Sequence, residues 1–133
     1  MKYVDSNIFI ANLIEDNRLG EAAKKYFEAV ASGEEAAATS VHTMIEIYAF
    51  LKGKKLSEQK IAGILKDIIQ HGVTLLPFEP KIFIEALPMV NKGWKLGDAI
   101  HYVTMGKHDI KEIVTDDGHF DNVAGITRID MLI

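Results

Sequence analysis

The sequence predicts an α/β fold, a three-layer α/β/α sandwich with a short, mainly parallel central sheet. Two observations carry this prediction. Short apolar runs of strand length alternate along the chain with longer segments whose apolar residues recur at helical spacing. Strands that alternate with helices run parallel and need cover on both faces of the sheet. No repeat, linker or low-complexity segment interrupts the 133 residues, so we expect a single domain over 1–133.

The N-terminal half is expected to contain two strands and three helices. A short β-type run ends at Asp5, and the apolar spacing that follows is helical, with a pause before a second helix. Ser40 is a good N-cap for a long apolar helix that stops near Gly53. The expected strands cover residues 2–4 and 36–39, and the expected helices cover residues 8–14, 19–30 and 40–51.

The C-terminal half continues the alternation. Ser57 begins an amphipathic helix that His71 and Gly72 close, and a strand then runs over 73–76. Pro88 lies inside the next helix and is expected to break it, since proline removes a backbone donor. The remaining expected elements are helices over 80–91 and 97–107, a strand over 112–115, a turn over 116–118 and an edge strand over 126–129.

Composition narrows the chemistry. The chain has no cysteine, which excludes disulfides, thiolate zinc sites and thiol nucleophiles, so any metal must bind oxygen or imidazole. The apolar stretches are shorter than the roughly 20 residues of a membrane span, and no signal-peptide core is evident. We therefore expect a cytoplasmic protein without a membrane partner.

The net charge of −4 is unusual for a protein that binds nucleic acid, because phosphate contacts favour basic surfaces. The average conceals the distribution, however. Removing four acids proposed below as metal ligands brings the formal charge to zero, and two bound divalent cations would neutralise that site. Mild acidity is therefore compatible with RNA as a partner.

Four acidic residues stand out by their position. Asp5 and Asp117 follow predicted strands, and the carboxyl ends of parallel strands share one edge of the sheet. Glu46 is the only formally charged residue in an apolar helical segment, which we expect to be buried, so it should face a metal, a cation or a solvated cleft. Asp98 lies in the first turn of another helix with an apolar face.

Carboxylates that converge without a counter-charge repel one another, and a divalent cation removes that conflict. An oxygen-ligand site without cysteine suits Mg²⁺ or Mn²⁺, whether one ion or two are held. Such ions activate water and neutralise the leaving oxygen in phosphodiester hydrolysis. The four acids therefore predict a metal-dependent nuclease, with RNA as the expected substrate.

The ordered motifs resemble those of PIN-domain ribonucleases over nearly the whole chain. They are Tyr3-Val4-Asp5-Ser6-Asn7, the mid-helix Glu46, Gly97-Asp98-Ala99 and Thr115-Asp116-Asp117-Gly118-His119-Phe120. Small single-domain members of this kind are commonly VapC-type toxins of prokaryotic toxin–antitoxin pairs. The resemblance implies a PIN-like fold, an endoribonuclease that uses Mg²⁺ or Mn²⁺, a homodimer and inhibition by a cognate antitoxin.

The resemblance also implies individual roles. Asp5, Glu46 and Asp98 match the three core acids and Asp117 the fourth, as metal ligands and catalytic residues. The family's Thr-x-Asp-x-x-Phe pattern falls on Thr115, Asp117 and Phe120. Ser6, Asn7 and Thr115 are expected in supporting roles, Asp116 occupies the variable position, and Asp121 is an added acid without an assigned role. Five lysines are candidates for guiding the RNA backbone: Lys52, Lys54, Lys55, Lys92 and Lys95.

Simpler interpretations exist for several of these residues. Asp5 and Asp98 also suit helix N-caps, and Asp116-Asp117-Gly118 also suits a solvated turn. His42 and Glu46 have a spacing that would allow a shared zinc ion, but no second histidine ligand is evident in the sequence. His101 and His119 could touch RNA or a leaving group, but core packing or surface exposure is expected. Trp94 could be an exposed recognition residue, and a core or dimer-contact role is an equal alternative.

Other functions remain open at this stage. A PIN-like scaffold that binds RNA or a protein without cutting, a housekeeping RNA-processing nuclease and a DNA-cutting relative all share the same motifs. An aspartyl phosphatase is disfavoured because Asn7 stands where a second acid is required. A phospho-receiver domain is disfavoured because Asp5 stands alone after the first strand and no phospho-accepting Asp follows a central one. Gly53-Lys54-Lys55 lacks the glycine and hydroxyl residues of a phosphate-binding loop.

Overall fold

The computed structural model describes residues 1–133 as six α-helices around a five-stranded sheet in which every neighbouring pair of strands is parallel. The strand order is β3-β2-β1-β4-β5. The strands are β1 (Lys2–Val4), β2 (Ala37–Ser40), β3 (Thr74–Leu76), β4 (Glu112–Val114) and β5 (Thr127–Ile129). The helices are α1 (Ser6–Leu13), α2 (Gly20–Ser32), α3 (Val41–Gly53), α4 (Glu58–Gln70), α5 (Pro80–Val90) and α6 (Leu96–Lys107), followed by a 3-10 turn, η1 (Gly118–Asn122).

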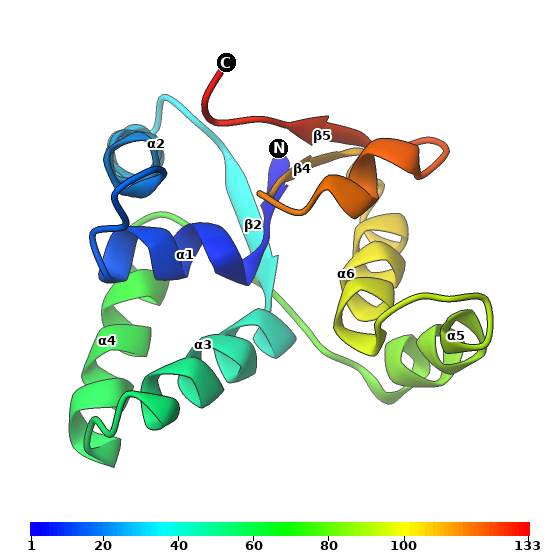
Figure 1. Ribbon diagram of the computed structural model, residues 1–133, viewed down its shortest axis with the longest axis horizontal. Helices are drawn as coiled ribbons and strands as arrows, with labels where there is room; N and C mark the ends of the chain where they lie inside the picture. The colour runs from blue at the N-terminus through cyan, green and yellow to red at the C-terminus, as the bar shows by residue number, and fades with distance from the viewer.

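The expected α/β/α sandwich is confirmed. Helices α1 to α4 lie on one side of the sheet and α5 and α6 on the other (Figure 1). Alternation along β1 and β4 supplies both faces: Val4 and Val114 belong to the core under α1 to α4, whereas Tyr3 and Ile113 belong to the core beside α6. All four side chains are fully buried, because a central strand has no solvent-facing side in a three-layer fold.

Serine caps define two of the helix starts that the sequence predicts. The Ser40 hydroxyl accepts from the backbone N–H of Thr43, and the Ser57 hydroxyl accepts from that of Lys60. Each cap satisfies one of the donors that a helix leaves unpaired at its N-terminus. The observed boundaries of α3 and α4 therefore follow from local sequence chemistry.

Two expectations about helices are wrong. Pro88 does not break its helix, because it lies in the last turn of α5, which ends two residues later at Val90. The α3 helix is not buried all round: Thr43, Met44 and Ile47 face the core, while the Ile45 side chain is 57% exposed. Apolar residues on the outer side of α3 thus made the segment look more buried than it is.

The order of the strands creates a switch point between β1 and β4. The chain runs from β1 outward through β2 to β3, then crosses to the other side of β1 and continues through β4 to β5. Clefts outside the carboxyl ends of strands form at such points because the connections diverge to opposite faces. No helix is both long enough and apolar enough to span a bilayer.

Candidate metal centre

Asp5 lies at the centre of the polar cluster at this switch point. It follows β1 directly, and its backbone N–H extends the pairing with β4 by donating to the Val114 carbonyl at 3.0 Å. The Asp5 carboxylate accepts from the Ser6 backbone N–H at 2.7 Å and from the Thr115 hydroxyl at 2.8 Å. The Ser6 hydroxyl adds a longer contact of 3.4 Å. Asp5 is therefore the N-cap of α1 and a member of the acidic site at the same time.

Thr115 and Asn7 connect this first acid to Asp117. The Thr115 hydroxyl, which donates to Asp5, accepts from the Asp117 backbone N–H at 3.1 Å and from the Asn7 amide at 3.0 Å. The Asn7 amide oxygen accepts from the Asp116 backbone N–H at 3.2 Å. Asp117 in turn caps η1 by accepting from the His119 backbone N–H. The supporting positions predicted for Asn7 and Thr115 thus lie between the two strand-end acids.

Glu46 reaches the cluster from α3 and meets a histidine there. His101 Nε2 lies 2.8 Å from Glu46 Oε1 and 3.4 Å from Asp5 Oδ1. Burial alone would raise the pKa of Glu46, but the hydrogen bond from His101 and the 3.6 Å contact with His42 outweigh it and lower this pKa to about 2. The carboxylate predicted to face a cation or a cleft thus stays ionised and faces an imidazole.

His101 is itself held from behind. Its side chain is 1% exposed, and its Nδ1 lies 2.6 Å from the Tyr3 hydroxyl, which is 3.4 Å from the Thr43 hydroxyl. Burial opposes a charged imidazole, but Tyr3, the Glu46 hydrogen bond and the Asp5 charge together raise the pKa of His101 to about 10. This buried residue was expected to be core or surface, and the structure instead places it between two of the predicted ligands.

Asp98 approaches from the first turn of α6. Burial, followed by the charges of Asp117 and Asp5, raises the pKa of the Asp98 carboxyl to about 6. The Asp98 carboxyl is not the N-cap, a position that Lys95 occupies. Like charges raise a carboxyl pKa only when they are close, so Asp98, Asp117 and Asp5 share one electrostatic environment.

The two other acids near this edge are engaged elsewhere. Asp116 forms an ion pair with Arg18. Asp121 accepts from the Arg128 guanidinium at 2.7 Å, and the same guanidinium donates to the Thr115 carbonyl at 3.2 Å. Arginine is a strong partner for a carboxylate, so Asp116 and Asp121 each already have a positive counter-charge.

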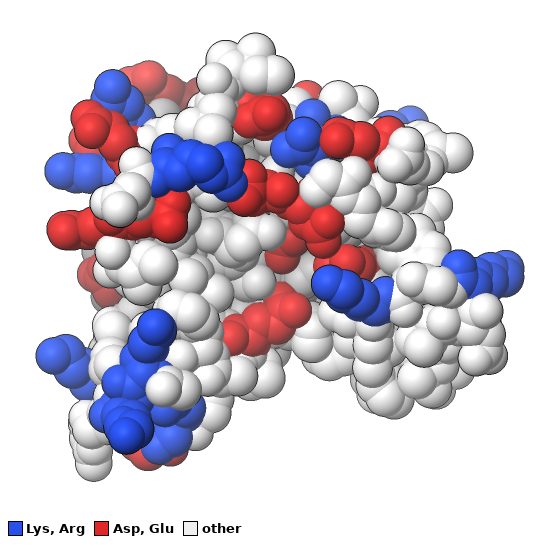
Figure 2. Space-filling model, in the orientation of Figure 1, with Lys and Arg blue, Asp and Glu red and all other residues white.

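The candidate lysines lie on either side of the acids rather than in one patch. Figure 2 shows acidic side chains gathered across the middle of this face and a basic cluster over the α3–α4 connection at the lower left. In that connection Lys52 pairs with Glu58 at 3.3 Å, and Lys54 lies over the Phe50 ring. Lys92 and Lys95 lie in and after the α5–α6 turn, and both are exposed.

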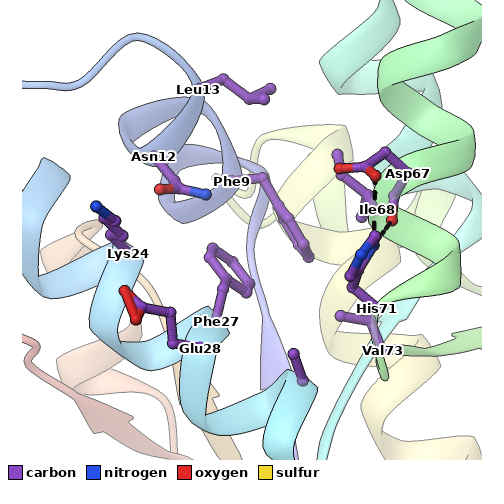
Figure 3. A pocket seen from close by; sticks show the side chains of 11 residues that line it. Phe9, Asn12, Leu13, Lys24, Phe27, Glu28, Asp67, Ile68, His71 and Val73 are labelled. Carbon is purple, nitrogen blue, oxygen red and sulfur yellow. Dashed lines mark hydrogen bonds and ion pairs between the residues drawn. The ribbon is translucent and has the colours of Figure 1, made fainter.

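A cavity with an aromatic wall lies apart from the acids. It has a volume of about 240 Å³ and lies between α1, α2 and α4, with the Phe9 and Phe27 rings and Ile68 in its wall (Figure 3). Its polar rim includes Lys24 and Asp67, and it contains none of the four predicted ligands. The chemistry expected from the carboxylates therefore belongs to the switch-point cleft and not to this cavity.

A sequence signal for His101 existed. His101 lies three residues after Asp98 on one helix, a spacing that puts both side chains on the same face.

Trp94 and His119 also approach this side of the molecule: their ring centroids lie 4.6 Å apart, and the ring centroids of Trp94 and Tyr102 lie 5.2 Å apart. The aromatic residues expected to be core or surface thus form a partly exposed wall near Asp117.

The fold and the site together define a class of protein: an α/β domain whose acidic residues meet at the carboxyl ends of the parallel strands, at the switch point of the sheet. The PIN domain pattern matches residues 2–126, and the chain belongs to the PIN domain family. No curated protein sequence gives a significant match.

Solved structures of the same fold agree with this assignment. The VapC20 toxin of Mycobacterium tuberculosis, described as cleaving the sarcin–ricin loop, is 16% identical, with a TM-score of 0.74 over 96% of this chain and 99% of that one. A toxin–antitoxin complex from Klebsiella pneumoniae is 21% identical, with a TM-score of 0.67 over 98% of both chains. VapBC2 of Rickettsia felis, bound to promoter DNA, is 15% identical, with a TM-score of 0.70 over 97% and 98% of the respective chains.

Proposed function

We propose that this protein is a Mg²⁺- or Mn²⁺-dependent endoribonuclease and the toxin of a toxin–antitoxin pair. The contacts of Asp5 carry the proposal: Asp5 and Glu46 both contact His101, the Thr115 hydroxyl links Asp5 to the Asp117 backbone, and the charges of Asp5 and Asp117 act on Asp98. Membership of the PIN domain family and the likeness to VapC folds support the same assignment.

The residues present fit a divalent cation. Burial and the charges of Asp117 and Asp5 raise the pKa of Asp98 to about 6, although His101 and His119 oppose them, so an added positive charge would be favourable there. The donors are carboxylate oxygens, the ligand type that Mg²⁺ and Mn²⁺ prefer. Asp5, Glu46, Asp98 and Asp117 would hold the ion or ions, and Asp116 and Asp121 remain with their arginines.

The protein's own residues orient and charge the site. The Thr115 hydroxyl and the Ser6 backbone N–H fix the Asp5 carboxylate, and the Thr115 hydroxyl also positions the Asp117 backbone. When bound, the divalent ion activates water and stabilises negative charge on the phosphodiester oxygens. RNA crossing the acids would meet lysines from the α3–α4 connection on one side and from the α5–α6 turn on the other.

The primary experiment is an RNA cleavage assay. We expect the purified full-length protein to cut RNA with Mg²⁺ or Mn²⁺ and to stop cutting when EDTA removes the ions, because the acids alone supply no activated water. Product analysis on denaturing gels measures this, with single-stranded DNA of the same sequence assayed beside the RNA. DNA cutting would redirect the proposal to a DNase, and metal binding without cutting of any RNA would favour a scaffold.

The pH dependence of metal binding is a second test. Because the pKa of Asp98 is raised to about 6, a proton competes with the ion below that pH. We expect Mg²⁺ affinity, measured by calorimetry between pH 5 and 8, to fall by up to about tenfold per pH unit below about 6. Asp98→Asn should bind more weakly but with a flatter profile. Identical slopes in the two proteins would contradict this role for Asp98.

The dimer proposal has support on α5. Phe83, Ile84, Leu87 and Val90 are 41%, 63%, 44% and 42% exposed, which is unusual for four apolar residues on one helix. We expect Ile84→Asp to convert a dimer to a monomer in sedimentation velocity, because an unpaired charge in an apolar interface is costly. Ile69→Asp, on the exposed side of α4, is the matched control. A wild-type monomer at micromolar concentration would refute the dimer.

The antitoxin proposal is tested separately. Two of the similar folds are VapBC toxin–antitoxin assemblies, which supports a small protein partner for this chain. A short neighbouring gene encoding a DNA-binding protein should yield a product that copurifies with this chain and suppresses RNA cleavage. Location among RNA-processing genes without such a partner would favour a housekeeping nuclease.

A further inference from the structure

One of the four acids, Glu46, also belongs to a group with two histidines. The ligand atoms of His42, Glu46 and His101 all lie within 4.8 Å of one another. His101 Nε2 is 2.8 Å from Glu46 Oε1, and His42 Nε2 is 3.6 Å from Glu46 Oε2. Each imidazole therefore faces a different oxygen of the same carboxylate.

The His42 ring nitrogen Nε2 lacks a hydrogen bond. It is buried, and its 3.6 Å contact with Glu46 Oε2 is longer than a hydrogen bond, although the side chain as a whole is 18% exposed. The ring is held edge-on against Phe78, at a centroid distance of 5.2 Å, so it is oriented rather than free. A buried polar atom without a partner is rare and calls for a ligand to complete it.

Gly97 leaves the space that a ligand would need. A methyl group at this position would lie 2.9 Å from Glu46 Oε2 and 3.7 Å from His42 Nε2. The absence of a side chain on Gly97 therefore keeps open the region between the carboxylate and the unsatisfied imidazole. Solvent reaches the same region, because the Glu46 side chain at its edge is 30% exposed.

His101 is supported in the manner of a metal-bound histidine. For Nε2 to coordinate an ion, Nδ1 must carry the proton and donate it to an acceptor. The Tyr3 hydroxyl lies 2.6 Å from Nδ1 and can accept this bond while donating to the Thr43 hydroxyl. The outer partner that fixes such a ring is therefore already in place.

We propose that His42, Glu46 and His101 form a second metal subsite that takes a transition ion such as Zn²⁺ in preference to Mg²⁺. Two imidazoles with one carboxylate are a donor set suited to zinc and unsuited to magnesium, which prefers oxygen. Glu46 belongs both to this subsite and to the carboxylate site, so the two ions would be neighbours. The subsite rests on these residues, and its link to catalysis rests on the proposed nuclease function.

The test is a Zn²⁺ titration of the metal-free full-length protein followed by calorimetry and by ¹⁵N NMR of the imidazoles. Of the five histidines of the chain, His71 and His108 lie away from the acids and act as internal references. We expect Zn²⁺ to shift the Nε2 signals of His42 and His101 and to leave His71 and His108 unchanged. Mg²⁺, which binds the carboxylates, should change the His101 signal only through its contacts with Asp5 and Glu46 and should leave the His42 Nε2 signal in place. Equal shifts with Mg²⁺, or Zn²⁺ shifts confined to the reference histidines, would overturn the subsite.

Variants separate this site from general metal binding. His42→Gln should weaken Zn²⁺ binding more than about tenfold, whereas the exposed His108→Gln should not change it. Gly97→Ala, which fills the open space from the opposite helix, should weaken Zn²⁺ binding as well. Zn²⁺ affinity that is insensitive to both His42→Gln and Gly97→Ala would refute the proposal.

The nuclease proposal is tested by different data, namely RNA cleavage. Zn²⁺ bound through His42 in a protein that cuts no RNA would retain the subsite and refute the nuclease function. RNA cleavage in Mg²⁺ with Zn²⁺ binding that does not require His42 would do the reverse.

Discussion

Asp5→Asn should reduce RNA cleavage about a thousandfold or more while leaving the fold intact. Asp5 is 5% exposed and is the carboxylate nearest to the other site residues, accepting from Ser6 and Thr115 and contacting His101. Asparagine retains one oxygen to accept from the Ser6 N–H, replaces the oxygen that accepts from Thr115 by an amide donor, and loses the charge that a divalent ion requires. A loss of about 4 kcal/mol of metal-dependent stabilisation of the transition state corresponds to about three orders of magnitude in rate.

The measurement is initial-rate cleavage in Mg²⁺, with circular dichroism and urea denaturation as checks on folding. Asp67→Asn makes the same chemical change on the exposed side of α4 and should cut like the wild type. Asp5→Asn that retains more than about a tenth of the wild-type rate, in a folded protein, would remove Asp5 from the catalytic site.

His101→Leu should destabilise the metal-free protein by about 3–5 kcal/mol. His101 is almost completely buried and partners Glu46, Asp5 and the Tyr3 hydroxyl. Leucine would fill most of the volume but leave carboxylates and a buried hydroxyl without their partner, and breaking a buried ion pair from one side costs this much. His101→Gln, whose amide can still donate to Glu46, should lose less.

Urea denaturation at pH 5.5 in EDTA measures the free energy of unfolding for these variants. His108→Leu, at the exposed C-terminal end of α6, should change it by no more than about 0.5 kcal/mol. A loss below about 1 kcal/mol for His101→Leu would show that the buried network contributes little to stability.

The pH dependence of this destabilisation has a defined sign. The pKa of His101 rises from 6.5 to about 10 on folding, so its contribution is complete below pH 6.5 and disappears as the pH rises toward 10. The pKa of Glu46 falls from 4.5 to about 2, so its contribution is complete above pH 4.5 and disappears toward pH 2. The difference between wild type and His101→Leu should therefore be largest between about pH 4.5 and pH 6.5.

Those values also describe how the site balances its charges. Glu46 and His101 form an ionised pair, whereas Asp98 has a raised pKa because burial and the charges of Asp117 and Asp5 outweigh the opposing charges of His101 and His119. A divalent ion would reduce the repulsion among Asp98, Asp117 and Asp5. It would also compete with the His101 imidazole for the Glu46 carboxylate. Metal binding should therefore reorganise the hydrogen bonds of His101 more than those of Thr115, which connect backbone and carboxylate.

The sequence by itself determined the elements of the fold and singled out the four acids of the proposed site. Apolar periodicity and serine caps are local, so α3 and α4 were predicted close to their observed boundaries. Asp5 and Asp117 follow strands, and parallel strands present their carboxyl ends at one edge, so their convergence followed from topology once β1 and β4 proved to be neighbours.

Only the tertiary structure decided what each acid contacts. Glu46 and His101 are separated by 55 residues, and nothing in either segment encodes the 2.8 Å contact between them. The pairing of Asp121 with Arg128 likewise depends on how the C-terminal strand β5 lies against η1. Periodicity reports which face of an element is apolar, but the partner of a buried polar group depends on how separate elements pack, and that packing placed a histidine among the carboxylates.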